Sequence, residues 1–295
     1  MAQLSTRRKF IQTCAATAAL LPLATLANKS SYNFCTFEKP LQFLSYDEMA
    51  DFVADCGFNG IEATVRKGGH VLPERVEEDL PRMVEALKKR GLEMTILTSD
   101  INNANQTQAR KVLTTMKKLG ITRYRMLWYN YDVAKPVRPQ LEAIRPQIKD
   151  LVALNREIGV SALYQNHSGA RMVGAPLWDI FELIREHNPK DIAVAFDIMH
   201  ATAEGGLDWP IQFNLVQSHL GAIYVKDFTW QNHKPKGAPL GAGQIDKSFF
   251  NLVKKSNFNG PISMHVEYLE GVKDRAKQAE AFKRDFATLR NFLAV

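Results

Sequence analysis

Ionisable side chains stand two residues apart at the ends of two short apolar runs in the C-terminal third of the chain. Tyr224 and Lys226 form one pair, and His265 and Glu267 form the other. Because side chains alternate along a β-strand, the members of each pair project from the same face. Carboxylate, imidazole and ammonium groups on one face are those that general acid–base chemistry uses. The pattern therefore predicts a site that transfers protons.

Other apolar runs also end in polar residues. Glu62, Gln165 and Asp197 each close such a run, and His167 and His200 follow two of them within three residues. An apolar core does not need these groups, and a buried charge is costly unless it is paired or binds a ligand. We therefore expect these side chains to converge on one rim of the fold.

The elements that must position these residues alternate between short β-rich runs and longer helical ones, as parallel βαβ units do. The strand candidates are Tyr32 to Phe37, Gly60 to Val65, Glu93 to Thr98, Arg123 to Trp128, Val160 to Gln165, Ile192 to Asp197, Ala222 to Asp227 and Ile262 to Glu267. The pattern predicts a single-domain α/β fold, a (β/α)8 TIM barrel. Reactive groups in such barrels lie at the C-terminal ends of the strands.

Helical segments separate the strand candidates. The clearest one runs from Pro73 to Lys89, with acidic residues in its first turn and basic residues in its last. Gly57, Gly120 and Gly159 each come shortly before a strand candidate, and each is expected to end the preceding helix.

The N-terminus has the features of an export signal. Arg7 and Arg8 precede a short, mostly apolar run from Ile11 to Leu26, and Ala27 follows as a small residue for cleavage. The run is too short and too interrupted for a membrane span. We expect a twin-arginine signal over residues 1–27, a mature domain over residues 28–295, and a periplasmic or otherwise extracytoplasmic protein without a stable membrane anchor.

Charge and cysteine content exclude several classes of protein. Removal of residues 1–27 takes away three basic residues and no acidic one, which lowers the formal net charge from +7 to +4. The remaining Lys and Arg residues form no tract, so we expect no nucleic-acid partner. Cys35 and Cys56 are too few for a disulfide scaffold and lack zinc-site spacing. We expect two buried thiols, with a single bond between them as the alternative.

In their order and spacing, the motifs of this chain resemble those of the xylose-isomerase-like TIM barrels. That superfamily includes sugar isomerases, hexulose 3-epimerases, hydroxypyruvate isomerases and inosose dehydratases. The marks are Gly60-Ile61-Glu62, Asn166-His167, Phe196-Asp197-Ile198-Met199-His200, Val225-Lys226-Asp227 and Pro239-Leu240-Gly241-Ala242-Gly243-Gln244-Ile245-Asp246. The resemblance covers nearly the whole mature chain and looks like that of an exported subgroup. It implies a small-molecule sugar substrate.

The resemblance also implies a divalent metal ion, because epimerase members bind one through four strand-end residues. By position, Gln165, Asp197, Tyr224 and Glu267 match that set, and His265 is a near alternative to the last. Two departures follow, since an amide at position 165 cannot act as a carboxylate base and a tyrosine with a pKa of about 10 is a poor ligand. Mg or Mn would be held weakly by two acids, whereas a histidine in the set favours Zn, Mn, Co or Ni. A degenerate metal site is the alternative.

Together, the strand-end residues and the resemblance predict a sugar or keto-sugar isomerase or epimerase that transfers a proton next to a carbonyl. Glu267 is the expected base, His200 or His265 the acid, and Lys226 the group that stabilises the enediolate oxygen. One alternative is a keto-glycoside lyase or hydratase on the same barrel, and another is a non-catalytic periplasmic sugar-binding barrel. A nuclease relative is disfavoured, because such enzymes need more histidine and acid ligands.

The side chains expected to contact the substrate are Glu62, Trp128, His167, Tyr224 and Trp230. The tryptophans are of a type that stacks on sugar rings. Glu62 has the alternative of pairing with Arg66 or Arg125, and Lys226 that of a structural ion pair with Asp197 or Glu267. Asp227 has the alternative of capping its own loop through backbone N–H groups. A homodimer is the default expectation for the oligomeric state.

Overall fold

The computed structural model describes residues 32–295, so the predicted export signal over residues 1–27 lies outside the described residues. Parallel strands close into a barrel in the order β1-β10-β7-β6-β5-β4-β3-β2. The barrel strands are β1 (Asn33–Phe37), β2 (Gly60–Val65), β3 (Glu93–Ser99), β4 (Arg123–Arg125), β5 (Ser161–Gln165), β6 (Ile192–Asp197), β7 (Leu220–Val225) and β10 (Pro261–Met264). The predicted (β/α)8 barrel is confirmed.

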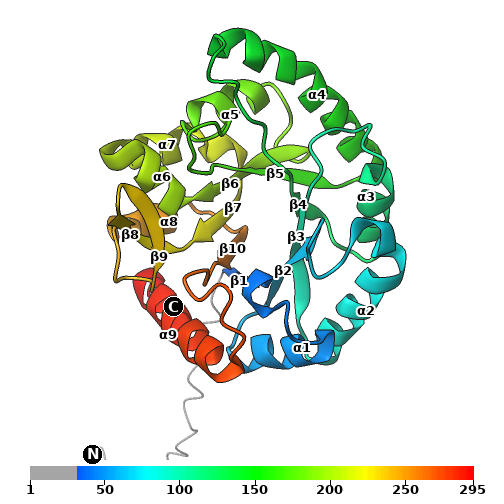
Figure 1. Ribbon diagram of the computed structural model, residues 1–295, viewed down its shortest axis with the longest axis vertical. Coiled ribbons are helices and arrows are strands. Elements are labelled where there is room, and N and C mark those ends of the chain that lie inside the picture. Colours follow the sequence, from blue (N-terminus) through cyan, green and yellow to red (C-terminus); the bar gives the residue numbers. More distant parts are fainter. Residues whose placement is uncertain (1–31) are drawn as a thin grey trace, which may run out of the picture.

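Helices surround the barrel on its outer side (Figure 1). Their bounds are α1 (Tyr46–Asp55), α2 (Val76–Lys89), α3 (Ala109–Lys118), α4 (Val137–Ile158), α5 (Trp178–Ile184), α6 (Ile198–Gly205), α7 (Trp209–Leu215), α8 (Ser248–Lys255) and α9 (Arg275–Leu293). Short 3-10 turns cover Lys39–Leu41, Pro73–Arg75, Gly206–Asp208 and Gln217–His219. The helix predicted from Pro73 to Lys89 is thus a 3-10 turn followed by α2. Gly57, Gly120 and Gly159 have φ angles of 87°, 85° and 82°, the left-handed conformation that ends a helix.

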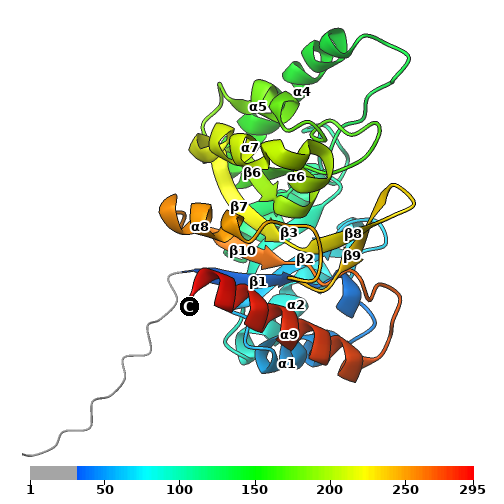
Figure 2. The ribbon, with the colours of Figure 1, turned by 90° about the vertical axis from the view of Figure 1, so that its left-hand side faces the viewer.

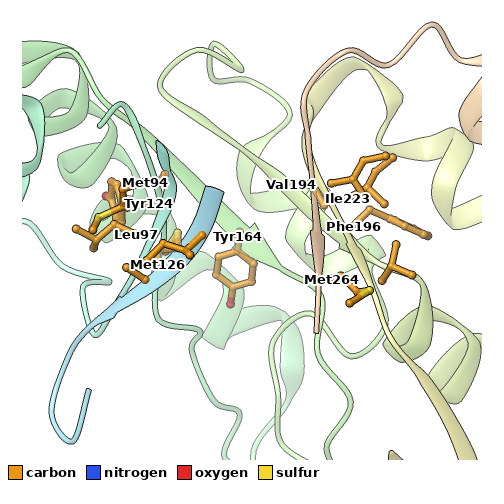
Figure 3. Packing of buried hydrophobic residues seen from close by; sticks show 14 of the residues in the cluster. Met94, Leu97, Tyr124, Met126, Tyr164, Val194, Phe196, Ile223 and Met264 are labelled. Atoms are coloured by element: carbon orange, nitrogen blue, oxygen red, sulfur yellow. The ribbon is translucent and has the colours of Figure 1, made fainter. Parts of the chain in front are cut away.

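The apolar core has two parts, one outside the strands and one inside them. Outward side chains of the strands pack against the helices, and Figure 3 shows members of this layer from β3 (Leu97), β5 (Tyr164), β6 (Phe196) and β7 (Ile223). A smaller cluster fills the barrel interior and consists of Cys35, Ile96, Leu163, Ala193, Ala195, Ala222 and Tyr224. The small alanine side chains let the interior fill without forcing the strands apart.

Strand alternation carries this inner face upward from the apolar cluster to polar residues. On β6, Ala193 and Ala195 belong to the inner cluster and Asp197 is next on the same face. On β5, Leu163 is followed on that face by Gln165. The barrel therefore has an apolar bottom and a polar mouth at the C-terminal ends of its strands.

A two-stranded antiparallel hairpin, β8 (Asp227–Gln231) and β9 (Lys234–Ala238), extends from the barrel after β7 (Figure 2). The sequence placed one strand from Ala222 to Asp227, but β7 ends at Val225. Asp227 instead begins the hairpin and accepts backbone N–H groups from Gly241, Gly243 and Ile245. The expectation that Asp227 caps its loop is confirmed.

Both cysteines of the described chain are buried and free, so the predicted pair of buried thiols is confirmed and the alternative bond between them is not formed. From residue 32 onward, none of the helices combines the length and the apolar character that crossing a membrane requires.

Candidate active site

A row of charged and polar side chains crosses the barrel mouth. His200 Nε2 lies 3.6 Å from Asp197 Oδ2, and the same oxygen lies 3.3 Å from Lys226 Nζ. Lys226 Nζ lies 3.1 Å from Glu267 Oε2, which is 3.7 Å from His265 Nδ1. Residues separated by as many as 70 positions, Asp197 and Glu267, are thus joined into one network, as the strand-end pattern predicted.

Asp197 is the buried centre of this row. Its Oδ1 accepts the backbone N–H of His200, so the carboxylate also caps the N-terminus of α6. Its Oδ2 accepts a hydrogen bond of 2.8 Å from Gln165 Nε2. Asn166 fixes the backbone here, because it donates to the carbonyl oxygen of Asp197 and accepts from its N–H. The side chain of Asp197 is fully buried and has no free face toward solvent.

Lys226 and Glu267 form the part of the network that is open to the mouth. The side chain of Glu267 is 25% exposed, whereas that of Lys226 is 10% exposed. Burial alone would raise the pKa of Glu267, but the charges of Lys226 and His265 hold this pKa well below its ordinary value. Burial opposes the charge of Lys226 too, yet Asp197 and Glu267 raise its pKa. Glu267 is therefore an ionised carboxylate held against an ammonium.

His200 belongs to a stack of aromatic rings on one side of the mouth. Its ring lies 3.9 Å from that of His167, and the His167 ring lies 4.9 Å from that of Trp128. Burial, reinforced by the charge of Lys226, lowers the pKa of His167 to about 4 and that of His200 well below its ordinary value. Ser168 Oγ lies 2.6 Å from His200 Nδ1, while His200 Nε2 has no hydrogen-bond partner among the described residues. His200 is thus a neutral imidazole with Nδ1 held by Ser168 and with Nε2 buried without a hydrogen-bond partner in residues 32–295.

Glu62 lies below the mouth, and protein groups engage both of its oxygens. It accepts hydrogen bonds from Thr98 Oγ1 at 2.6 Å and Ser263 Oγ at 2.7 Å. His265 Nε2 lies 3.0 Å from Glu62 Oε2 and Arg125 Nε lies 3.6 Å from Oε1, which realises one of the two pairings weighed for Glu62. Burial opposes the charge, but His265 and Arg125 lower the pKa of Glu62 to about 2.

His265 connects Glu62 with Glu267 and is completely buried. Its ring is held between Phe37, at 4.7 Å, and Tyr224, at 4.6 Å. Burial disfavours its charged form, but the two carboxylates outweigh this effect and raise its pKa. Burial and the nearby Glu62 raise the pKa of Tyr224 well above its ordinary value, so this phenol stays neutral.

Gln165 is oriented by two charged neighbours. Its Oε1 accepts from Arg125 Nη1 at 2.7 Å, and its Nε2 donates to Asp197. This is the only orientation in which an amide satisfies both a guanidinium donor and a carboxylate acceptor. The amide oxygen therefore faces Arg125, and the N–H group faces Asp197.

Several groups of the site were absent from the sequence prediction. Arg125, a cation in a buried strand, had been considered only as a partner of Glu62. Ser168 is not among the predicted site residues, although its position next to His167 is a usable signal. Lys39 Nζ, 3.6 Å from Glu267 Oε1, follows β1, a strand end for which no polar residue was predicted. In contrast, Trp230 lies on the hairpin, is 50% exposed, and packs against Phe228.

The arrangement does not fit a divalent metal ion. Of the expected set, Gln165 presents an N–H group toward Asp197, and His265 is engaged by Glu62. Lys226 Nζ lies between Asp197 and Glu267 at ion-pair distance from both. Within residues 32–295, no group of three or more His, Cys, Asp and Glu side chains is arranged to hold a metal ion. The chemistry proposed below therefore uses none.

Solved structures with the same fold include sugar-modifying enzymes. A D-psicose 3-epimerase, determined in the presence of D-fructose, is 14% identical with a TM-score of 0.65, covering 89% of this chain and 100% of that one. The 3-keto-D-glucoside 4-epimerase of E. coli is 14% identical with a TM-score of 0.67, covering 88% and 99%. A probable 3-DHS dehydratase from Bacillus anthracis is 14% identical with a TM-score of 0.68, covering 88% of this chain and 99% of that one. At these identities the likeness shows the fold alone, and no curated protein matches the chain in sequence.

A family model for the xylose isomerase-like TIM barrels matches residues 50–292, which is most of the chain. The match includes all the strands of the barrel except β1, and it includes the row of side chains at the mouth. The chain therefore belongs to the xylose isomerase-like TIM barrel family.

Proposed function

We propose that this protein isomerises or epimerises a sugar or keto-sugar by moving a proton at a carbon next to a carbonyl. The observation that carries the proposal is the accessibility of Glu267. The side chains of Glu62 and Asp197 are fully buried, whereas that of Glu267 is 25% exposed. Of these carboxylates, Glu267 alone can touch a substrate, and we assign it the role of base.

Lys226 supports the base and the transition state together. Its ammonium has three protons, and Asp197 and Glu267 account for two of them. The third is available to a substrate oxygen. When a proton leaves carbon, negative charge grows on the neighbouring carbonyl oxygen, and a fixed cation in a poorly solvated site stabilises that charge.

His200 is the group we assign as acid. If the Ser168 hydroxyl donates to Nδ1, the proton of the neutral imidazole is on Nε2, the atom without a partner among the described residues. Glu267 takes a proton from carbon, the C–H electron pair becomes the double bond of an enediol, and the carbonyl oxygen takes the Nε2 proton. Glu267 then returns its proton to the adjacent carbon, while the hydroxyl on the first carbon gives its proton to His200 Nε2 and becomes the new carbonyl, which gives the isomer. The epimer forms when the enediol turns its opposite face to Glu267 before the proton returns to the first carbon, and the enediol hydroxyl gives its proton back to Nε2.

The other side chains that were predicted to contact the substrate differ in whether they can reach it. The stacked rings of Trp128 and His167 present a flat wall against which the apolar face of a sugar ring can pack. Trp230, which is half exposed, would contact only a substrate that extends beyond the mouth. We assign Glu62 and Tyr224 to positioning His265, because both are fully buried and both contact its ring.

The structural neighbours support the substrate class. They include epimerases acting on D-psicose, 3-keto-D-glucoside and L-ribulose. All are small sugars or sugar derivatives with a carbonyl, the group that makes an adjacent C–H bond acidic enough to be deprotonated.

A second candidate is a lyase or hydratase acting on a keto-glycoside. It is favoured by the asymmetry of the mouth, where one accessible carboxylate, Glu267, and one neutral imidazole, His200, belong to the same row of side chains. β-Elimination needs one base for the C–H proton and one acid for the leaving oxygen, which is this pair of groups. A probable dehydratase is among the proteins that share the fold.

Solvent exchange tests both candidates in one experiment. The purified protein is incubated in D2O with a panel of ketoses, aldoses and 3-keto-glycosides, and NMR records deuterium at the carbon next to the carbonyl. We expect exchange with conversion to an isomer or, for the second candidate, release of the leaving group. Glu267→Gln should lose at least about a hundredfold in rate, the usual contribution of a general base.

Glu270→Gln is the matched control, because Glu270 also pairs with Lys39 but has a side chain that is 61% exposed. Glu267→Gln exchanging as fast as this control would refute the assigned base. Tight sugar binding without exchange by any panel member would indicate the sugar-binding alternative.

We also propose that residues 1–27 direct twin-arginine export and that residues 28–295 form the mature, extracytoplasmic domain. Support comes from the paired arginines ahead of a short apolar run. Arg7→Lys/Arg8→Lys should retain the protein in the cytoplasm while its fold is unchanged. Periplasmic recovery equal to that of the parent chain would contradict this proposal.

A further inference from the structure

We propose that the Lys226 ammonium takes the place of a divalent cation between Asp197 and Glu267, so that removing it converts the mouth into a metal site. The two carboxylates approach Lys226 Nζ to 3.3 and 3.1 Å, each through its Oδ2 or Oε2 atom. Such convergence of two carboxylates on one point is what binding a hard cation requires.

The barrel topology places Lys226 at that point. Strands neighbour each other in the order β10-β7-β6, so β7 lies between the strand that ends in Asp197 and the strand that precedes Glu267. Lys226 is the first residue after β7 and continues the inward face of Tyr224. Its side chain thus rises between the two carboxylates, and only 10% of it is exposed.

Gln165 and Arg125 reinforce the exclusion of metal. Arg125 Nη1 holds the amide oxygen of Gln165, and this turns the amide N–H group toward Asp197 Oδ2. That oxygen therefore accepts from an amide and is 3.3 Å from an ammonium. A divalent ion would have to displace both donors, and it would meet the fixed charge of Lys226 at close range.

This inference does not depend on the proposed reaction, because metal binding is measured without substrate. A wild-type protein that neither binds metal nor exchanges sugar protons would overturn the proposed function and leave the inference standing. A wild-type protein that exchanges protons and binds metal stoichiometrically would overturn the inference and leave the proposed function standing.

The test compares Mn²⁺ binding to the wild-type protein, Lys226→Ala and Lys226→Gln, by calorimetry and by the EPR signal of free Mn²⁺. We expect Lys226→Ala to bind one Mn²⁺ at least about tenfold more tightly than the wild type, because Asp197 and Glu267 then lack the cation that lies between them. The gained site should disappear in Lys226→Ala/Asp197→Asn. Circular dichroism checks that each variant is folded. If the alanine variant is not folded, Lys226→Gln fills more of the space of the lysine side chain without its charge.

Lys39→Ala is the matched control. Lys39 Nζ also lies near Glu267, at 3.6 Å from Oε1, but its side chain is 30% exposed and it also pairs with Glu270 at 2.8 Å. Its removal should not create a metal site. The proposal is overturned if the wild type binds one equivalent of Mn²⁺ that Asp197→Asn abolishes, or if a folded Lys226 variant binds Mn²⁺ no better than the wild type and Lys39→Ala.

Discussion

Glu62→Gln should destabilise the fold more than an ordinary change of a carboxylate, because Glu62 is the buried counter-charge of two cations. His265 Nε2 lies 3.0 Å from its Oε2, and Arg125 Nε lies 3.6 Å from its Oε1. Glutamine has nearly the shape of the protonated acid, so the substitution removes the charge with little change in volume. Arg125 and His265 then remain buried without that partner.

The magnitude follows from the pKa of Glu62, which falls from an ordinary 4.5 to about 2. A fall of roughly 2.5 units at about 1.4 kcal/mol per unit gives about 3 kcal/mol. This agrees with the about 3–5 kcal/mol lost when one member of a buried ion pair is removed. We expect the free energy of unfolding of Glu62→Gln to be lower than that of the wild type by about 3 kcal/mol at neutral pH.

Urea unfolding followed by circular dichroism at several pH values measures this difference. Because the folded pKa is depressed, the stabilisation is complete above pH 4.5 and is lost as the pH falls toward about 2. The difference in the free energy of unfolding between the wild type and Glu62→Gln should therefore become smaller as the pH falls. Glu270→Gln, an exposed carboxylate, is the control and should change stability by less than about 0.5 kcal/mol. Equal stability of the two variants at neutral pH, or a gap that does not depend on pH, would refute the reasoning.

Three further predictions concern other parts of the molecule. Burial raises the pKa of Asp179 from 3.8 to about 6, so its contribution should lower the free energy of unfolding of the wild type by up to about 3 kcal/mol as the pH rises through that window. Thermal unfolding of Asp179→Asn should lack this fall, and parallel curves of stability against pH for the two proteins would contradict the prediction. Lys226→Gln removes the main charge that holds the pKa of Glu267 down, so the acid limb of kcat/KM for proton exchange should move to higher pH. An acid limb that does not move would exclude Glu267 as the titrating base. Gly243→Ala should cost about 1–3 kcal/mol in urea unfolding, because the new methyl group would collide with the Asp227 carboxylate and a backbone oxygen, and an unchanged midpoint would show that the loop yields.

The strands that the sequence predicted best are those with the strongest local signal. β2 and β6 have the bounds expected for Gly60–Val65 and Ile192–Asp197, because each is a wholly buried run with a clear end. β6 ends in the acid Asp197, and β2 is followed by a turn. The hairpin of β8 and β9 was missed. Its second strand, Lys234–Ala238, is polar and contains both Pro and Gly, residues that are rare in strands, and it is held by pairing with β8 rather than by burial.

The candidate site was predictable as a set of residues but not as a set of partners. Alternation along an extended chain made His265 and Glu267 neighbours, and their side-chain atoms lie 3.7 Å apart. The pairing of Glu62 with Arg125 or Arg66 stayed open in the sequence. Barrel closure decided it, because β3 brings Thr98 and β4 brings Arg125 to the same buried carboxylate.

The sequence by itself determined that this chain folds as a (β/α)8 barrel with acids, imidazoles and one lysine at its mouth, since short apolar strand runs and helix-ending glycines act locally. The tertiary structure alone decided which charges neutralise which. Lys226 lies between Asp197 and Glu267, and the amide oxygen of Gln165 faces Arg125, because strands far apart in the chain meet at the mouth. Electrostatic pairing depends on a few ångströms of separation in a poorly solvated interior, and that distance is a property of the closed barrel.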